Sequence, residues 1–466
     1  MGRGLYAAAE VKRIHGLADM TRGKPSSHIV RFALPLMSCY ALQQLYTLAD
    51  GIVIGRLLGV QAFAAVGTAG FLVWTVISLV MGFTQGFGTR MAQRFGAGDT
   101  EGFRQSAAMA VWIGITVVSV IMAVGLGTAR SLLLLLNTPE ELIANALVYL
   151  HCIIAGLPAC MAYNLCGALL YAVGNSRTPL IAIALSSILS IIADVILVAF
   201  CGAGVAGAAI STVLSQLCAF GICLSALRKM KILMPQKKDF KPDARVILDL
   251  LRLGAPLAAR NAVIATGGLM VQAVVNGFGE LFVAGLAAAK RYYGLLEIAC
   301  AGLEVATGTF CGQNAGAGDF TRIKQGVRIS RRLGLLASLM IAVPVYLLAP
   351  HLIALLVTDG ASEISAVLTH GTNALRAMAL CLPALYWLCL HRAAIQGMGY
   401  MTVPALSGFT ELLFRLMSVH LLTAMMGFWG IYLADGIGWT AGALLVFVTY
   451  TCLIKNKERS ARRLNA

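Results

Sequence analysis

The sequence predicts an all-α membrane protein with twelve transmembrane helices in two six-helix bundles and a central cavity. Of the 466 residues, 59% are hydrophobic and only 12% are charged, and the mean hydropathy is +0.82. The pattern of apolar stretches also occurs twice along the chain. Because a water-soluble fold of this size cannot bury so much apolar surface, we expect a protein that crosses the membrane many times.

Each span follows from its length and apolar character, since a helix needs about 20 apolar residues to cross a hydrocarbon core of about 30 Å. Twelve stretches meet this criterion. They are residues 29–54, 61–88, 106–127, 141–170, 179–200, 203–227, 253–277, 281–310, 333–356, 363–390, 403–425 and 430–454. An even number of spans places both ends of the chain on one side of the membrane.

The distribution of Lys and Arg predicts the orientation, because cytoplasmic loops retain these residues. Most of the 36 Lys and Arg lie at the two ends and in every second loop. These basic segments are the arm to Arg31, residues 89–105, Arg177, residues 228–252 and 313–332, Arg392, and the tail from Lys455. The opposite loops hold only Arg56 and Arg130. We therefore expect a multi-pass protein of the cytoplasmic (inner) membrane with both termini in the cytoplasm.

The net charge of +16 and the pI near 9.5 do not indicate a nucleic-acid partner. The positive charge lies in short loops beside the spans, where it sets the topology and meets anionic lipid headgroups. Membrane lipids are therefore the expected partners, with no nucleic acid and no required protein partner.

Several classes of protein are not supported by the sequence. The first residues lack the apolar core of a signal peptide, and the start is either Met1 or Met20. The twelve cysteines lie mostly within spans without a C-x-x-C pair, so reduced, packed thiols are expected. No H-E-x-x-H or G-x-S-x-G motif is present. We expect no catalytic residues, no metal and no cofactor, and hence no enzyme.

Two parts of the chain repeat each other. The segment QRFGAGDTEGFRQ from Gln93 matches QNAGAGDFTRIKQ from Gln313, 220 residues later, and with an offset of 225 Gly174 matches Gly399. Each G-A-G-D loop is expected to form a tight turn that ends one span and caps the next helix. A phosphate-binding loop would instead need a preceding strand and a following Lys-Ser/Thr.

The repeat predicts the domain organisation. We expect a cytoplasmic arm (1–27), a first bundle (28–227), a basic linker (228–245), a second bundle (246–455) and a cytoplasmic tail (456–466). Both halves have an even number of spans and so run in the same orientation. Such pairs of bundles commonly enclose a site that opens alternately to each side, which favours a transporter, although duplication alone can also build a membrane scaffold.

In their order and spacing these motifs resemble the MATE (multidrug and toxic compound extrusion) family, in particular its DinF-like branch, within the MOP flippase superfamily. The resemblance covers about residues 28–455. It rests on the two Q-x-x-G-A-G-D loops, on DGIVIGRLLG in the first span, and on GNSRTPL followed by SIIADVILV around the fifth. It implies a secondary active antiporter for multidrug efflux, which exports organic, cationic compounds in exchange for H⁺ or Na⁺ by alternating access.

The resemblance also implies which residues couple the ion. Acidic residues in the first and fifth spans of the branch match Asp50 and Asp194, and Tyr46 and Thr212 lie where the branch has further coupling residues. The branch commonly has Asn at the position of Ser190. This substitution argues against Na⁺ coordination more than against proton coupling.

The two aspartates stand out independently of any family. Asp50 follows Arg31 by nineteen residues and Asp194 follows Arg177 by seventeen. At ~1.5 Å per residue, both carboxyl groups are expected roughly 25 to 29 Å from the cytoplasmic boundary. A charge inside a span costs at least ~2.5 kcal/mol and usually marks an ion or substrate pathway.

The repeat indicates that the fold itself does not need these acids. The positions equivalent to Asp50 and Asp194 in the second half are Val271 (or Met270) and Val419. Burial and a neighbouring carboxylate both favour the protonated form of a carboxyl group, as a coupling site requires. The alternative is that the pair only hydrogen-bonds helices together.

The second half has its own charges within spans. Lys290, Glu297 and Glu304 recur every seven residues, which keeps them on one helix face and suits a cationic substrate. The alternative is mutual neutralisation with a nearby arginine. The candidates are Arg260, Arg291 and Arg376.

Other polar residues within spans have less specific interpretations. Gln43, Gln44 and Asn164 are candidates to line the substrate cavity or orient the acids, with helix packing as the alternative. Glu411 and Arg415 are spaced for a structural ion pair on one helix.

Two other functions remain open at this point. A flippase for a lipid-linked precursor would share the two-bundle plan, and its anionic substrate would suit the basic residues of the second half. A membrane-embedded enzyme or a receptor belongs to another class. The absence of catalytic motifs argues against the enzyme, and the duplication and short loops argue against the receptor.

Overall fold

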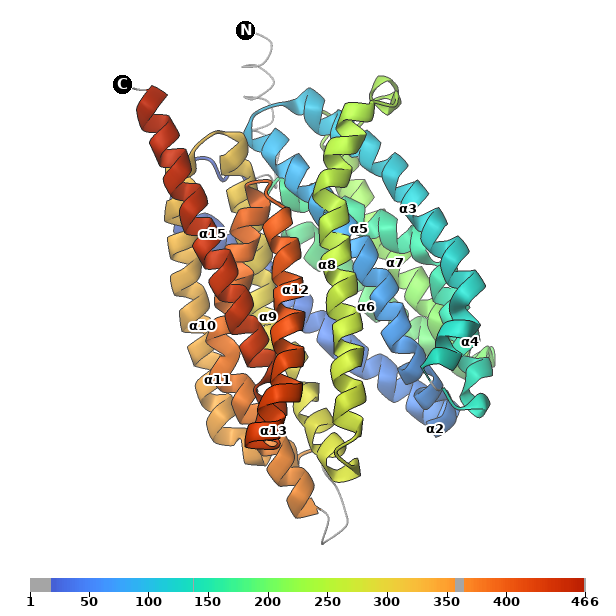
Figure 1. The fold of residues 1–466 in the computed structure, drawn as a ribbon. Helices are drawn as coiled ribbons and strands as arrows, with labels where there is room; N and C mark the ends of the chain where they lie inside the picture. The colour runs from blue at the N-terminus through green and yellow to red at the C-terminus, as the bar shows by residue number, and fades with distance from the viewer. Residues whose placement is uncertain (1–17, 137, 357–363, 465–466) are drawn as a thin grey trace. The chain divides into compact units, whose positions relative to one another are not determined.

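The computed structural model describes residues 18–136, 138–356 and 364–464, and within them every regular element is a helix (Figure 1). Residues 1–17 of the predicted arm and 465–466 of the predicted tail lie outside this part. In chain order the elements are α2 (Pro25–Gly96), α3 (Thr100–Leu135), α4 (Glu140–Ala155), α5 (Leu157–Ala172), α6 (Arg177–Asp194), η1 (Val195–Phe200), α7 (Gly204–Lys229), η2 (Lys237–Phe240), α8 (Ala244–Asn276), α9 (Glu280–Gly316), α10 (Phe320–Ala354), α11 (Ile364–Gly397), α12 (Thr402–Met417), η3 (Ser418–Leu422), α13 (Thr423–Met426), α14 (Trp429–Tyr432) and α15 (Ala434–Leu464).

The helices account for eleven of the twelve predicted spans by length and apolar character. Among the described residues, ten helices are long and apolar enough to cross a membrane, and α4 and α5, which meet at a bend of 46°, make one further span. The predicted span 29–54 lies in α2 before Gly59, where φ is 83° and ψ is 179° and the helix is therefore broken. The prediction of an all-α, multi-pass membrane protein is confirmed. Some helices extend well past the predicted limits, since α9 has 37 residues and α10 has 35.

The backbone repeats where the sequence repeats. Matched glycines in the two halves adopt the same left-handed conformation, which costs little without a Cβ atom. The pairs are Gly59 and Gly279 (φ 83° and 90°), Gly98 and Gly318 (70° and 75°), and Gly174 and Gly399 (80° and 89°). The halves therefore turn in the same way at three equivalent loops.

Both G-A-G-D loops form the predicted cap. The Asp99 side chain accepts a hydrogen bond from the backbone N–H of Gly102 at 2.8 Å, at the start of α3. Asp319 accepts one from the N–H of Arg322, also at 2.8 Å, at the start of α10. The prediction of a structural turn followed by an N-cap is confirmed.

The helices group into two compact units. Of the described residues, the first unit contains 18–19 and 38–259, and the second contains 20–37 and those from 260 to 464. In the first unit α7 packs against α4, α5 and α6. In the second unit α11 packs against α9, α10 and α15, and α12 lies beside α15 (Figure 1). The boundary between the units falls inside α8, whereas the domain limits predicted from the repeat remain a prediction.

The predicted linker is held against the first unit. Its short 3₁₀ helix η2 contains Asp239, which pairs with Arg104 of α3 at 3.3 Å. The indole N–H of Trp112 donates to the Phe240 carbonyl at 3.2 Å. Residues 237–240 therefore pack on α3.

Two helices change their hydrogen bonding at equivalent places. The π-helix η1 begins directly after Asp194, and the π-helix η3 begins directly after Met417 and contains Val419. The repeat pairs Asp194 with Val419. π-helical turns are rare and occur frequently at functional sites. The fifth helix of each half is therefore a place where a functional site is expected.

Candidate functional site

Asp50 and Asp194 meet within the first unit. Their carboxyl groups lie within hydrogen-bonding reach of each other. Asp194 is fully buried, and it also accepts a hydrogen bond from the Ser211 hydroxyl of α7. Two carboxyl groups can share a contact of this kind only when a proton or another cation lies between them. The equal depths expected from the sequence agree with this contact.

Each aspartate has one buried oxygen without a donor. Asp50 Oδ1 and Asp194 Oδ2 accept no hydrogen bond from an N–H group or a hydroxyl of the described residues. Leaving a buried acceptor unpaired is costly. Carboxylate oxygens are also the groups that accept a proton or a hard cation. The chemistry of these atoms therefore fits an exchangeable proton or a small monovalent cation.

Hydroxyl groups join the three helices around the acids. The Tyr46 hydroxyl lies 3.0 Å from Ser190 Oγ and 3.4 Å from Thr212 Oγ1. Ser190 is fully buried one turn before Asp194 in α6. The structure therefore brings together all five residues predicted for ion coupling, from α2, α6 and α7.

Sequence reasoning missed two residues at this site. Ser211 precedes the predicted Thr212, and only the rotation of α7 decides that Ser211 points toward Asp194. Tyr149 of α4 is buried and close enough to interact electrostatically with both aspartates. Its span has no unusual polar pattern that could have identified it.

The other polar candidates of the first half are not part of this cluster. The side-chain amide of Asn164 donates to the Cys160 carbonyl of its own helix at 2.8 Å, as its packing alternative predicts. Gln43 is exposed and Gln44 is half-buried. Neither glutamine has a side-chain hydrogen bond among the described residues, and their predicted cavity role stays a prediction.

Arg392 organises the buried charges of the second unit. It donates to Glu304 of α9 and to Glu411 of α12, each at 3.3 Å. Arg392 was expected in a cytoplasmic loop, but α11 continues to Gly397 and buries it. The direct ion pair of Glu304 is therefore with Arg392, which the sequence did not suggest as a partner. Arg260, one of the arginines proposed from the sequence, lies close enough to interact electrostatically with Glu304 and Glu411.

The remaining charges of this unit also differ from the expected pattern. The predicted pair of Glu411 with Arg415 is wrong, since Arg415 pairs with Asp435 of α15 at 2.8 Å. Glu297 accepts a hydrogen bond from the Tyr293 hydroxyl, one turn earlier in α9. Lys290 donates to the amide oxygen of Gln272 at 3.3 Å. The three residues predicted as one stripe therefore have three different kinds of partner.

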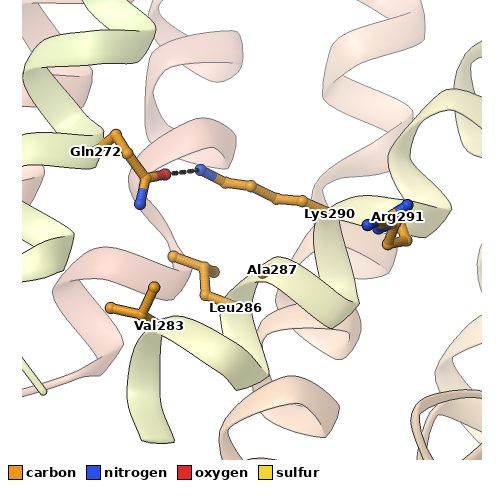
Figure 2. Close-up of a pocket in the computed structure, with 6 residues that line it drawn as sticks. All are labelled: Gln272, Val283, Leu286, Ala287, Lys290 and Arg291. Carbon is orange, nitrogen blue, oxygen red and sulfur yellow. Dashed lines mark hydrogen bonds between the residues drawn. The ribbon is translucent and has the colours of Figure 1, made fainter. Parts of the chain in front are cut away.

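A pocket of about 240 Å³ lies between α8 and α9 in the second unit. Figure 2 shows Lys290 extending from α9 toward Gln272 of α8. Three small or aliphatic residues of α9 form the apolar side of the pocket. Figure 2 shows the Arg291 side chain extending on the other side of Lys290 from Gln272. The lining residues are Gln272, Val283, Leu286, Ala287, Lys290 and Arg291.

No group of three or more His, Cys, Asp or Glu side chains in the described part of the chain is arranged to hold a metal ion. All twelve cysteines are free thiols.

Comparison with known proteins identifies relatives over both halves. The family model described as MatE matches residues 35–196 and again residues 256–420. The probable multidrug resistance protein YpnP of Bacillus subtilis is 32% identical over 314 residues, which cover 66% of this chain and 68% of that protein. YoeA of the same organism, also a probable multidrug resistance protein, is 25% identical over 353 residues, 74% of this chain and 76% of that protein.

A solved structure has the same fold over nearly the whole chain. It is that of a MOP superfamily transporter from Pyrococcus furiosus, whose binding pocket is described as having a reverse polarity that suggests a different function. The TM-score is 0.86 at 25% identity, and the match covers 96% of this chain and 99% of that one.

Proposed function

Since this chain belongs to the MATE family of multidrug transporters, we propose that it is a secondary active antiporter that exports organic, cationic compounds in exchange for H⁺. The coarser statement, that it is a multi-pass membrane transporter for small organic substrates and not an enzyme, follows from the family itself. The coupling ion, the charge of the substrate and the direction of transport are the proposal.

The contact between Asp50 and Asp194 is the observation that most supports this function. Two carboxyl groups that touch inside a helix bundle bind a proton more readily than two separated ones. An ion drives transport only when it binds two conformations with different affinity. Any movement of α2 against α6 changes the distance between the carboxyl groups, and with it their affinity for the proton.

Proton coupling is favoured over Na⁺ coupling by the immediate surroundings. Ser190 stands where the DinF-like branch, which the sequence resembles, commonly has Asn, and its hydroxyl lies beside Tyr46. A Na⁺ ion takes several oxygen ligands, whereas a proton needs only the two carboxyl groups that already meet. The order of basic and non-basic loops supports cytoplasmic termini in the cytoplasmic membrane, so protons would enter from outside.

The test uses inverted membrane vesicles in which respiration has established a proton gradient. Addition of a cationic dye should dissipate that gradient in vesicles with the wild-type protein, equally with and without Na⁺. Asp50→Asn and Asp194→Asn should abolish the response without lowering the amount of protein in the membrane. Asp249→Asn, the same chemical change at an acid that pairs with Arg90, should leave it intact.

Three results would contradict the proposal. Full activity of either aspartate variant would exclude this carboxyl pair as the coupling site. A response that requires Na⁺ would assign the coupling to that ion. If no dye in a panel of cationic dyes dissipates the proton gradient in wild-type vesicles, cation export would be contradicted.

A further inference from the structure

Residues 20–22, which we call the anchor segment, are held by the turn between α9 and α10 within the second unit. Met20 is fully buried, and its N–H donates to the side-chain oxygen of Gln313 at 2.8 Å. The Met20 carbonyl accepts from the Asn314 amide at 3.2 Å and from Arg322 Nε at 3.0 Å. Arg322 Nη2 also donates to the last carbonyl of the segment at 2.8 Å. The side chains of the turn therefore bind the backbone of the anchor segment.

The anchor segment and the start of α2 form one folded piece. Gly23 has a φ of 75°, a conformation that costs glycine little, and the chain turns there so that α2 begins two residues later at Pro25. His28, in the first turn of α2, donates from Nε2 to the Arg22 carbonyl at 2.7 Å. A displacement of the anchor segment therefore displaces the start of α2.

The turn between α9 and α10 does not itself need the Arg322 side chain. The Asp319 cap of this turn has its counterpart in Asp99, because both halves build the same turn. With the offset of 220, however, Arg322 corresponds to Gly102, which has no side chain. The backbone N–H of Arg322 serves the cap, whereas its guanidinium group binds the anchor segment and lies over the Phe310 ring at 5.5 Å. This side chain is therefore a feature of the second half alone.

Helix α2 connects the anchor segment to the acidic site. It is uninterrupted from Pro25 to Leu58, and its residues up to Met37 belong to the second unit. A Cβ atom on Gly302 of α9 would lie 2.6 Å from Met37 Cγ, so the two helices are in close contact. Asp50 follows Met37 by 13 residues, about 20 Å along the same helix, and belongs to the first unit. Since apolar contact is non-directional, the hydrogen bonds of the anchor segment give α2 a defined position along its axis.

We propose that Arg322 is a positioning residue for the coupling site. By holding the anchor segment it sets the position of α2, and with it the contact of Asp50 with Asp194. A shift of α2 along its axis by one residue would move Asp50 by about 1.5 Å, which is enough to break a hydrogen bond between two carboxyl groups. This inference rests on the proposed function, in which the same contact holds the exchangeable proton.

Chemical labelling of the purified protein in detergent tests the proposal without any ion gradient. Dicyclohexylcarbodiimide reacts with protonated carboxyl groups in apolar surroundings, and mass spectrometry measures how fast Asp50 and Asp194 are labelled at pH 7. Arg322→Met keeps an apolar side chain over Phe310 but removes both donors. Labelling should then be about three- to tenfold slower, because separated carboxyl groups bind a proton less readily. An unchanged rate, or a wild type in which neither acid is labelled, would overturn the proposal.

An insertion separates positioning from stability. Two glycines inserted between Gly23 and Lys24 leave the contacts of Arg322 in place but disconnect them from α2. This insertion should slow labelling as much as Arg322→Met, with a melting temperature within about 2 °C of wild type. Arg322→Lys, which keeps a donor for the two carbonyls, should recover part of the rate. Arg328→Met, the same chemical change at an exposed arginine of α10, should behave as wild type. A wild-type rate in the insertion variant would show that the anchor segment only stabilises the fold, and would overturn the proposal.

Transport in inverted vesicles gives a second readout. Arg322→Met and the insertion should each lower the maximal rate of dye-driven proton movement by about three- to tenfold. The dye concentration for half-maximal rate should not change, because the position of α2 affects the proton step and not the binding of the dye. A raised half-maximal concentration with an unchanged maximal rate would assign Arg322 to substrate binding and overturn the proposal. If wild-type vesicles respond to no dye, the proposed antiport fails, whereas the labelling rates still decide the role of Arg322, so the two failures are distinguishable.

Discussion

Arg392→Gln is expected to destabilise the second unit by about 4 to 5 kcal/mol at pH 7. The change leaves Glu411 (8% exposed side chain) and Glu304 (25% exposed) without their cation. Removing one partner of a buried ion pair typically costs about 3 to 5 kcal/mol. A stranded glutamate can instead take up a proton, at about 1.4 kcal/mol for each pH unit above about 4.3, or about 3 to 4 kcal/mol at pH 7. Whether Glu411 stays charged without a partner or takes up a proton, the variant loses about 3 to 4 kcal/mol of stability at this residue. The more exposed Glu304 adds about 1 kcal/mol to the loss.

The loss should depend on pH in a defined direction. The folded variant holds a proton that the unfolded chain releases above about pH 4.3, so its stability relative to wild type falls as the pH rises. Near pH 5 the cost of protonating Glu411 is about 1 kcal/mol, so that with the contribution of about 1 kcal/mol from Glu304 the loss should shrink to about 2 kcal/mol. A purely steric defect would show no such dependence.

The assay is the apparent melting temperature in detergent at pH 5 and pH 7. At an unfolding entropy of about 2.1 cal/mol/K per residue, a chain of 466 residues melts about 1 °C lower for each kcal/mol lost. We therefore expect a decrease of about 4 to 5 °C at pH 7 and about 2 °C at pH 5.

Two controls define the refuting result. Lys324→Gln removes an exposed ion pair and should cost less than about 1 °C. The triple variant with Gln in place of Arg392, Glu304 and Glu411 should recover most of the loss, because it removes the stranded charges as well. The electrostatic reasoning is refuted if Arg392→Gln melts within about 1 °C of wild type at pH 7, or if the triple variant is no more stable than the single one.

The remaining predictions concern the acidic site and the loops. Tyr46→Phe removes the hydroxyl that contacts Ser190 and should slow dye-driven proton movement in vesicles by about 3- to 10-fold; an unchanged rate would contradict a role for this contact. Ser211→Ala removes the hydrogen bond to buried Asp194 and should lower the melting temperature by about 1 to 3 °C, whereas Ser211→Thr should not; equal losses would point to packing instead. Asp319→Ala removes an N-cap and should cost about 1 °C, with Asp319→Asn as its control; no loss would show that the cap is dispensable.

Features that depend on position along one helix could be predicted from the sequence. The spans follow from apolar length, and the capping role of Asp99 follows from its place before α3. The depths of Asp50 and Asp194, counted from basic residues at the membrane boundary, placed them at one level, and the structure has them in contact. Rise per residue fixes such distances before any packing is known.

Features that depend on the pairing of helices could not be predicted. Arg415 lies one turn after Glu411 and could have paired with it, yet it pairs with Asp435 because α12 lies beside α15. Arg392 looked like a loop residue because apolar length alone does not show how far a helix continues beyond the membrane. The local partner was not available to Arg415, because Glu411 pairs with Arg392 of α11.

The π-helix after Asp194 restricts how this chain can change in length. Val198 of η1 packs with Ile54 and Ala208, while Asp194 faces Ser211. A π-helical turn closes its hydrogen bonds over one residue more than an α-helical turn. Loss or gain of one residue within 195–197 would rotate Val198 against Asp194 by about 100°, so that the two contacts could not persist together. Homologous chains with an aspartate at the position of Asp194 should therefore tolerate substitutions in the following π-helical segment far better than insertions or deletions.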